Sequence, residues 1–259
     1  MKFGVCADLN VAPALAKAGF DFLELNVQTH LKPQEPEEAF RPILKQIRAC
    51  PLPCKAANCF VPANLKITGE DIGRKRLRAY AQVAFDRARR AGIETIVFGS
   101  GGARRVPDGF PRNRAWEQLV EFGRMIGPLA GKQGVTVAVE PLNRQECNVL
   151  TTVAEGAAYV REVNHPAIRL LADAYHWNRD SDRAEDIVAA GPLLRHVHVA
   201  TCPGRAAPGC DDMDLAPFFD ALLQAGYDGR VSIESQWQDM PSQAPKALAA
   251  LKVLAKEGP

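Results

Sequence analysis

Short apolar runs alternate along the chain with longer segments in which apolar residues recur every three or four positions. A short apolar run bounded by turn residues favours a buried strand, and the longer spacing favours an amphipathic helix. The pattern predicts strands at 2–7, 20–25, 55–59, 93–98, 135–139, 168–172, 194–199 and 229–233. It predicts helices at 13–18, from a Pro-rich loop at 32–36 up to 48, and at 72–91, 113–131, 153–163, 184–190, 215–225 and 245–256.

This regular alternation predicts the fold class. Strands that alternate with helices form parallel sheets, and eight such units within 259 residues are typical of a closed (β/α)8 TIM barrel of class α/β. A doubly wound open sheet is the alternative, but such a sheet more often has five to seven strands. Because composition does not change along the chain, we expect residues 1–259 to form a single domain.

The predicted strand at 135–139 is followed directly by a candidate functional residue. Val135, Val137 and Val139 read as a strand buried on both faces, and Pro141 bars it from continuing. Pro141 also restricts the preceding residue, Glu140, to an extended backbone. A carboxylate is therefore held at the carboxyl end of a buried strand. An ion pair between Glu140 and Arg144 is the plainer interpretation of this stretch alone.

Three later strand ends change that interpretation. The sixth strand ends at Asp173, the seventh carries His198 near its end, and the eighth ends at Glu234. The carboxyl ends of barrel strands open onto one face, so these side chains and Glu140 converge there. Each alone would be a rim carboxylate or a core histidine, but three crowded carboxylates repel one another unless a cation is present. The set predicts a divalent metal site, with Mn²⁺ or Mg²⁺ favoured and Co²⁺ or Zn²⁺ as alternatives.

The composition of the chain limits the classes of binding partner and the cellular location that we expect. The net charge of +2 is too small to favour nucleic-acid or membrane binding by bulk electrostatics, and 47% hydrophobic with 24% charged residues is ordinary for a globular protein. Seven Cys residues without a C-x-x-C pair indicate reduced thiols in a cytoplasmic protein. The N-terminus lacks a secretory pattern, and no apolar run reaches the length of a membrane span.

Several motifs together resemble a known family. They are Glu140-Pro-Leu-Asn-Arg-x-Glu146, Asp173-x-x-His176, His196-x-His198 with a following Arg205, and Val-Ser-Ile-Glu234. The sequence is similar to the sugar isomerase/epimerase superfamily with xylose-isomerase-like barrels, above all to ketose 3-epimerases and hydroxypyruvate isomerase. The resemblance implies that Glu140, Asp173, His198 and Glu234 bind the metal. It also implies that Glu146, His176 and Arg205 hold the carbonyl end of a sugar or keto-sugar, and it allows a homo-oligomer.

The residues make chemical sense in these roles. A divalent ion that bridges a ketone oxygen and the neighbouring hydroxyl acidifies the C–H between them by stabilising the enediolate. Two carboxylates on opposite sides of that planar intermediate can remove a proton from one face and return one to the other. Glu140 and Glu234 are the predicted catalytic pair, and Arg205 and His176 are donors for the developing oxyanion.

Some stretches depart from the family pattern. The ketose epimerases place a Trp near the fourth strand end, where this chain has Gly99-Ser-Gly-Gly-Ala-Arg-Arg105. A loop of this composition is more often a Gly-rich turn with solvated arginines than an anion site. An anion site would suggest a phosphorylated or carboxylated substrate. Trp177 is a candidate for the missing aromatic face, and Phe60 is a candidate apolar wall of the pocket. The Pro-Gly-Arg205 run is closer to hydroxypyruvate isomerase.

Other functions remain open at this point. A metal-dependent lyase or dehydratase acting on a keto-sugar or inosose would use the same residues, and the missing Trp mildly favours it. A keto-acid isomerase is a further variant of the proton-transfer reaction. An abasic-site endonuclease of the same superfamily would need additional ligands on strands two and three, which end here in Asn26 and Asn58. A barrel that binds a sugar without catalysis would bind metal yet exchange no proton.

Overall fold

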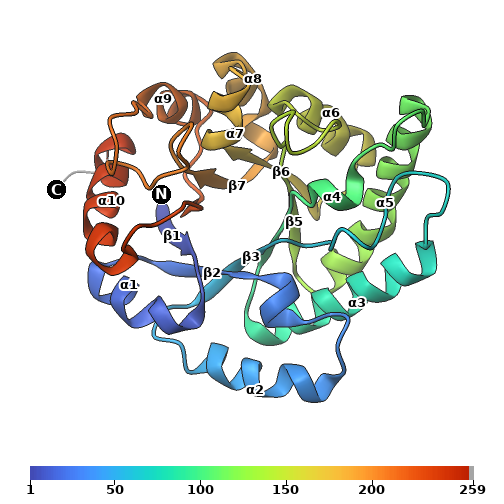
Figure 1. The fold of residues 1–259 in the computed structure, drawn as a ribbon, viewed down its shortest axis with the longest axis horizontal. Helices are drawn as coiled ribbons and strands as arrows, with labels where there is room; N and C mark the ends of the chain where they lie inside the picture. The colour runs from blue at the N-terminus through green and yellow to red at the C-terminus, as the bar shows by residue number, and fades with distance from the viewer. Residues whose placement is uncertain (257–259) are drawn as a thin grey trace.

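The computed structural model describes residues 1–256, which form a closed barrel of eight strands that pair in chain order. All eight pairings are parallel, including the closing pair between the first and last strands. The strands form an inner ring and the helices an outer one (Figure 1). The strands are β1 Lys2–Cys6, β2 Phe22–Asn26, β3 Cys54–Asn58, β4 Thr95–Phe98, β5 Thr136–Val139, β6 Ile168–Asp173, β7 Leu194–Val199 and β8 Arg230–Ile233. The predicted TIM barrel is confirmed.

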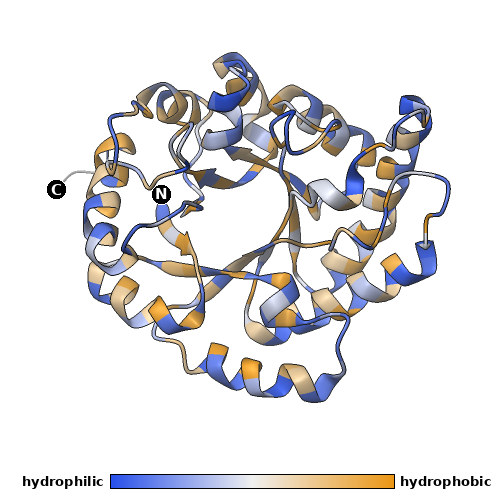
Figure 2. Cartoon of the chain, viewed as in Figure 1, coloured by the Kyte–Doolittle hydropathy of each residue, from blue (hydrophilic) through white to orange (hydrophobic). Residues whose placement is uncertain are grey.

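The longer helices cover the outside of the barrel (Figure 1). Apolar and polar positions alternate along them, with polar residues on the outer surface (Figure 2). The helices are α1 Ala12–Ala18, α2 Glu37–Arg48, α3 Arg74–Ala91, α4 Gly101–Arg104, α5 Arg112–Lys132, α6 Val153–Val163, α7 Ala174–Arg179, α8 Ala184–Ala190, α9 Ala216–Gln224 and α10 Met240–Leu254. None of the helices in residues 1–256 combines the length and the apolar composition that crossing a membrane requires.

The predicted boundaries differ from the observed ones in a few places. Helix α10 begins at Met240 and not at Pro245, because Pro241 occupies its first turn, where a missing N–H costs nothing. The short helices α4 and α7 were not predicted, since each directly follows a strand and is too short for a periodic pattern. Helix α7 begins because the Asp173 side chain accepts a hydrogen bond from the backbone N–H of His176 at 3.0 Å.

The interior of the barrel is divided into an apolar and a polar part. Val97, Ala138 and Leu171, on β4, β5 and β6, form an apolar cluster separate from the main core. On the other side, Glu24 of β2 is in contact with His196 of β7 across the barrel. The side chains at the next inward positions towards the carboxyl ends face the mouth of the barrel. Because side chains along a strand alternate between inward and outward positions, this arrangement places four potential ligands close together at the mouth.

Candidate metal centre and substrate cavity

A cavity of about 440 Å³ opens at the carboxyl ends of the strands. Its walls come from the loops after β2, β3, β4, β5, β6, β7 and β8. The lining residues are Gln28, Asn58, Cys59, Val61, Ala63, Gly99, Ser100, Gly101, Gly102, Glu140, Leu142, Glu146, His176, Arg205 and Glu234. The cavity is large enough for a small-molecule substrate and contains five of the seven sequence-predicted site residues.

The four predicted metal ligands lie together at this end of the barrel. One donor atom each from Glu140, Asp173, His198 and Glu234 lies within 4.8 Å of the other three. Measured from His198 Nδ1, the nearest oxygens are Glu140 Oε1 at 3.1 Å, Glu234 Oε2 at 3.4 Å and Asp173 Oδ2 at 3.8 Å. His198 and Asp173 are the deeper members, 0% and 3% exposed, while Glu140 and Glu234 also line the cavity.

The backbone at Glu140 is fixed by a buried arginine. Arg104, fully buried, donates to the carbonyl oxygen of Glu140 at 2.7 Å, to that of Phe98 at 3.0 Å and to that of Leu150 at 3.3 Å. A buried guanidinium that satisfies three carbonyls ties the ends of β4 and β5 to the loop beyond them. Glu140 therefore pairs with His198, and Arg144 pairs with Asp180 at 3.3 Å instead. The simple Glu140–Arg144 ion pair does not form.

Electrostatics distinguish the two predicted catalytic carboxylates. Burial raises the pKa of Glu140, and the neighbouring carboxylates of Glu234 and Asp173 add to the rise against the opposing effect of His198. Burial acts in the same direction on Glu234, but His198 and Arg205 outweigh it and lower its pKa to about 2. The His198 pKa is raised well above its ordinary value, because nearby acidic groups overcome the effect of burial.

The donor set fits a divalent cation on chemical grounds. Three carboxylate groups and one imidazole offer oxygen and nitrogen ligands of the kind that Mn²⁺ and Mg²⁺ bind. Carboxylates packed this closely in a buried site need compensating positive charge.

The three residues implied for substrate binding lie along one side of the cavity. His176 Nδ1 accepts from the backbone N–H of Asn143 at 3.2 Å and lies 2.8 Å from its side-chain Nδ2. His176 Nε2 is buried and has no hydrogen-bond partner among the described residues. Because Nδ1 is an acceptor, Nε2 carries the proton. The structure thus presents one unused N–H donor at the cavity.

Arg205 lines the cavity, where the resemblance placed it. Its guanidinium lies 2.6 Å from Glu234 Oε2 and 3.8 Å from Glu146 Oε1, and it lies over the Tyr175 ring at 4.6 Å from the ring centroid. The residue has a φ of 51°, in the left-handed region, which a non-glycine residue adopts at some cost.

Four candidate residues in the surrounding loops do not line the cavity. Phe60 is fully buried and packs on Tyr80, Phe85, Phe98 and Phe122. Trp177 packs against Phe218. Of the two loop arginines, Arg105 is exposed and donates to a backbone carbonyl, as a solvated residue would, but Arg104 is buried. Neither arginine lines the cavity, so the loop brings no guanidinium group to it.

Sequence reasoning missed several polar residues around the centre. Asn58 Nδ2 donates to Glu234 Oε1 at 2.7 Å, and Asn143 holds His176 and also donates to Glu146 Oε1 at 3.0 Å. Glu24, on β2, bonds His196 and His198. Asn58 and Glu24 both lie at inward positions of strands. That position is the signal in the sequence by which they could have been found. The role of Asn143 depends on a contact across two loops and had no local signal.

The comparison with known proteins identifies the family. A family model described as "Xylose isomerase-like TIM barrel" matches residues 12–257, nearly the whole chain. The chain belongs to the xylose isomerase-like TIM barrel family. This assignment agrees with the fold and with the resemblance that the strand-end motifs indicated.

The chain is similar in part to sugar epimerases. The barrel is 38% identical over 111 residues to a ketose 3-epimerase of Arthrobacter globiformis, covering 42% of the chain and 38% of that relative. It is 31% identical over 123 residues to a 3-dehydro-D-guloside 4-epimerase of Escherichia coli, covering 47% of each. These alignments span less than half the length of either relative.

The fold also matches solved structures over nearly its whole length. A D-psicose 3-epimerase of Clostridium cellulolyticum H10, solved with D-tagatose, superposes with a TM-score of 0.85 at 22% identity. The superposition covers 98% of this chain and 99% of that one. At this level of identity the match establishes the shared barrel architecture.

Proposed function

We propose that this xylose isomerase-like barrel is a divalent-metal-dependent isomerase or epimerase that transfers a proton at the carbon beside the carbonyl group of a keto-sugar. The observation that carries the proposal is the placement of Glu140 and Glu234. They follow β5 and β8, strands separated in the barrel by β6 and β7, and both line the same cavity. The named relatives, a ketose 3-epimerase and a 4-epimerase, support it.

Glu140 and Glu234 supply the acid and base. One carboxylate removes the proton from one face of the substrate carbon, and the other returns a proton to the opposite face for epimerisation. For isomerisation, the proton returns to the neighbouring carbon. Asn58 and Arg205 each donate to one oxygen of Glu234, which fixes the plane of that carboxylate before substrate arrives.

His176 and Arg205 bind the substrate oxygen. The unpartnered Nε2–H of His176 is available to a carbonyl oxygen, and donors aimed at the place where negative charge develops lower the barrier. Arg205 is held by Glu146, Glu234 and the face of Tyr175, so its guanidinium is oriented without substrate. Glu146 therefore contributes to substrate binding by positioning Arg205 and Asn143.

Glu140, Asp173, His198 and Glu234 are the residues that would hold the metal ion. We propose Mn²⁺, with Mg²⁺, Co²⁺ and Zn²⁺ as alternatives, from the mixture of carboxylate and imidazole donors. When bound, such an ion acts as a Lewis acid that polarises the carbonyl group and stabilises negative charge on its oxygen.

The cavity favours a neutral, unphosphorylated sugar. Its ionisable lining includes Glu140, Glu146 and Glu234, and the guanidinium of Arg205 is already paired with two of these. A phosphate group would meet excess negative charge there.

We propose further that residues 1–259 form one domain and that the protein is cytoplasmic, since all seven cysteines are free. We propose no nucleic-acid or membrane partner, and light scattering will test for a homo-oligomer.

Metal removal and restoration test the proposal. Dialysis against EDTA should abolish conversion across a panel of ketoses and lower the thermal midpoint, and Mn²⁺ should restore both. An ion that binds only the folded state stabilises it by about 2.7 kcal/mol at one hundred times its Kd. An EDTA-treated protein, shown to be free of metal, that keeps full activity would contradict the metal-dependent proposal.

A further inference from the structure

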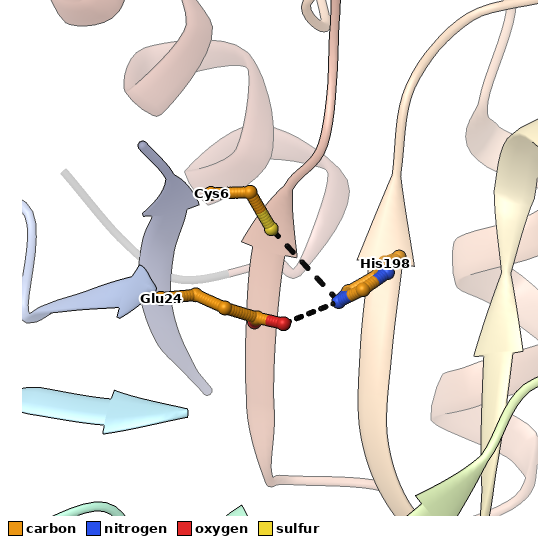
Figure 3. A group of neighbouring side chains, drawn as sticks. All are labelled: Cys6, Glu24 and His198. Atoms are coloured by element: carbon orange, nitrogen blue, oxygen red, sulfur yellow. Dashed lines mark hydrogen bonds and ion pairs between the residues drawn. The ribbon is translucent and has the colours of Figure 1, made fainter. Parts of the chain in front are cut away.

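A buried hydrogen-bond cluster lies directly behind His198, on the side away from the other predicted ligands. His198 Nε2 lies 2.9 Å from Glu24 Oε1 (Figure 3). The other oxygen of Glu24 is 2.7 Å from His196 Nε2 and 2.5 Å from the Ser232 hydroxyl. The four side chains are at most 1% exposed. Nothing in the proposed proton transfer uses Glu24, His196 or Ser232.

The chemistry of a carboxylate fixes the direction of these hydrogen bonds. An ionised carboxylate only accepts, so each of its three neighbours has to donate to it. His196 fits this direction, because its Nε2 reaches Glu24 and its Nδ1 has no partner among the described residues. His198 therefore donates through Nε2–H. Its remaining nitrogen, Nδ1, is the one that faces Glu140, Asp173 and Glu234.

We infer that Glu24 is a positioning residue for the metal centre: it accepts from Nε2–H of His198 and so orients the ring with Nδ1 towards the space among the three carboxylates, where Nδ1 would be the ligand atom when the metal is bound. This inference rests on the proposed function. A carboxylate that accepts from the far nitrogen of a metal-binding histidine fixes its tautomer and ring orientation and raises its basicity. Ser232 and His196 in turn fix Glu24, so the ring is held from three strands, β2, β7 and β8.

The same geometry argues against a second ion between Cys6, Glu24 and His198. Cys6 Sγ lies 4.0 Å from His198 Nε2, on the same side as Glu24 (Figure 3). A ring nitrogen that carries a proton offers no lone pair to a metal. Cys6, Glu24 and His198 therefore do not form a second metal site, and Glu24 serves the one predicted metal centre.

The test compares Glu24→Gln with Ser232→Ala in the full chain. Glu24→Gln keeps the volume but places an amide with both donor and acceptor between the two histidines. Calorimetric titration with Mn²⁺ should show affinity reduced by about 10- to 100-fold, a typical loss for such a partner. Ser232→Ala, which leaves the Glu24 Oε1 contact with His198 in place, should lose far less. Thermal midpoints of the metal-free proteins report whether each variant is folded.

Ring ¹⁵N–¹H NMR of the parent protein gives a second readout that needs no folded Glu24 variant. In the Zn²⁺-loaded protein, His198 should carry its proton on Nε2, identified as the signal missing from His198→Gln. If Nε2 has no proton, or if folded Glu24→Gln binds Mn²⁺ as tightly as the parent, this inference is overturned while the proposed function stands. If the parent binds neither ion, the proposed function fails and the inference falls with it.

Discussion

Arg205 Nη2 lies 2.6 Å from Glu234 Oε2, which joins the loop after β7 to the residue that follows β8. Arg205 Nε also approaches the backbone carbonyl of Glu234, at 3.4 Å. One guanidinium thus contacts the side chain and the backbone of a predicted catalytic carboxylate. Glu234 and its surroundings raise the Arg205 pKa further above its ordinary value despite the opposing effect of burial, so this cation stays charged.

Replacing Arg205 with Ala should reduce turnover without removing the metal. The four predicted ligands remain, but the substrate oxygen loses a donor, which typically costs about 10²-fold or more in kcat. Steady-state kinetics and metal content measured on the same sample check this. Arg144→Ala is the matched control, because Arg144 pairs with Asp180 and does not line the cavity. Equal kinetics for Arg205→Ala and the parent would mean that Arg205 does not serve the reaction. His176→Ala should behave like Arg205→Ala.

Asp173→Asn should weaken metal binding while leaving the fold intact. Asp173 Oδ1 caps α7, and Asn is an equally good cap, so the helix start survives the change. The variant removes one negative charge from the cluster, and the affinity for Mn²⁺ should fall. Asp182→Asn is the control, since Asp182 accepts from the Val153 backbone N–H outside the site. Parental Mn²⁺ affinity in Asp173→Asn would show that the ligand set is wrong.

Gly99→Ala should impair activity more than stability. A Cβ at this position would lie 2.2 Å from Glu140 Oε2, so the carboxylate must move. A displacement of about 1 Å in a reacting group can cost about 10²-fold in rate. At Gly73, a Cβ meets only the Arg76 side chain, at 3.6 Å, so Gly73→Ala is the control. If Gly99→Ala has parental kcat with an unchanged thermal midpoint, Glu140 has more freedom than the structure indicates.

A polar cluster at the opposite end of the strands predicts an acid-dependent loss of stability. Glu94 Oε1 lies 2.7 Å from Lys55 Nζ, and Arg230 bonds its other oxygen. Burial acts to raise the Glu94 pKa, but these two cations outweigh it and lower the pKa below its ordinary value of 4.5. Because the folded pKa is the lower one, the stabilisation is present above pH 4.5 and is lost as the pH falls through the folded pKa.

Glu94→Gln should therefore lower the free energy of unfolding at pH 7 and leave it nearly unchanged in acid. Glu94 is 40% exposed, so screening keeps the loss at pH 7 to roughly 1 kcal/mol or less. Urea unfolding between pH 3 and pH 7 measures it, with the exposed Glu117→Gln as control. A stability difference between Glu94→Gln and the parent that does not shrink in acid would contradict this account.

The fold could be predicted because its signal is repeated eight times. Each strand is short and apolar, and errors of one or two residues at its ends, as at β2 and β3, leave the topology unchanged. The positions of Glu140, Asp173, His198 and Glu234 followed from the same signal, since carboxyl ends of barrel strands meet at one face. The structure brings these four together as expected; their role as ligands stays a prediction.

The surrounding loops were less predictable because their contacts depend on distant segments. Arg104 looked like a surface residue in a Gly-rich turn, yet it satisfies three carbonyls from β4, Glu140 and the loop at Leu150. Phe60 looked like a pocket wall, but four aromatic residues of α3, β4 and α5 enclose it. The acidic Glu24 in a strand was visible in the sequence, but its partners lie on β7 and β8.

The proton-transfer proposal is tested most directly by incubating the Mn²⁺-loaded protein with ketoses in D₂O. We expect deuterium on the carbon beside the carbonyl, with either an epimer or an aldose as product. Glu140→Gln and Glu234→Gln should stop that exchange, and their metal content must be measured in the same samples, because both residues are also predicted ligands. A product that has lost water would instead indicate a dehydratase. The absence of exchange across ketoses, keto acids and inososes, in protein shown to hold its metal, would contradict the account.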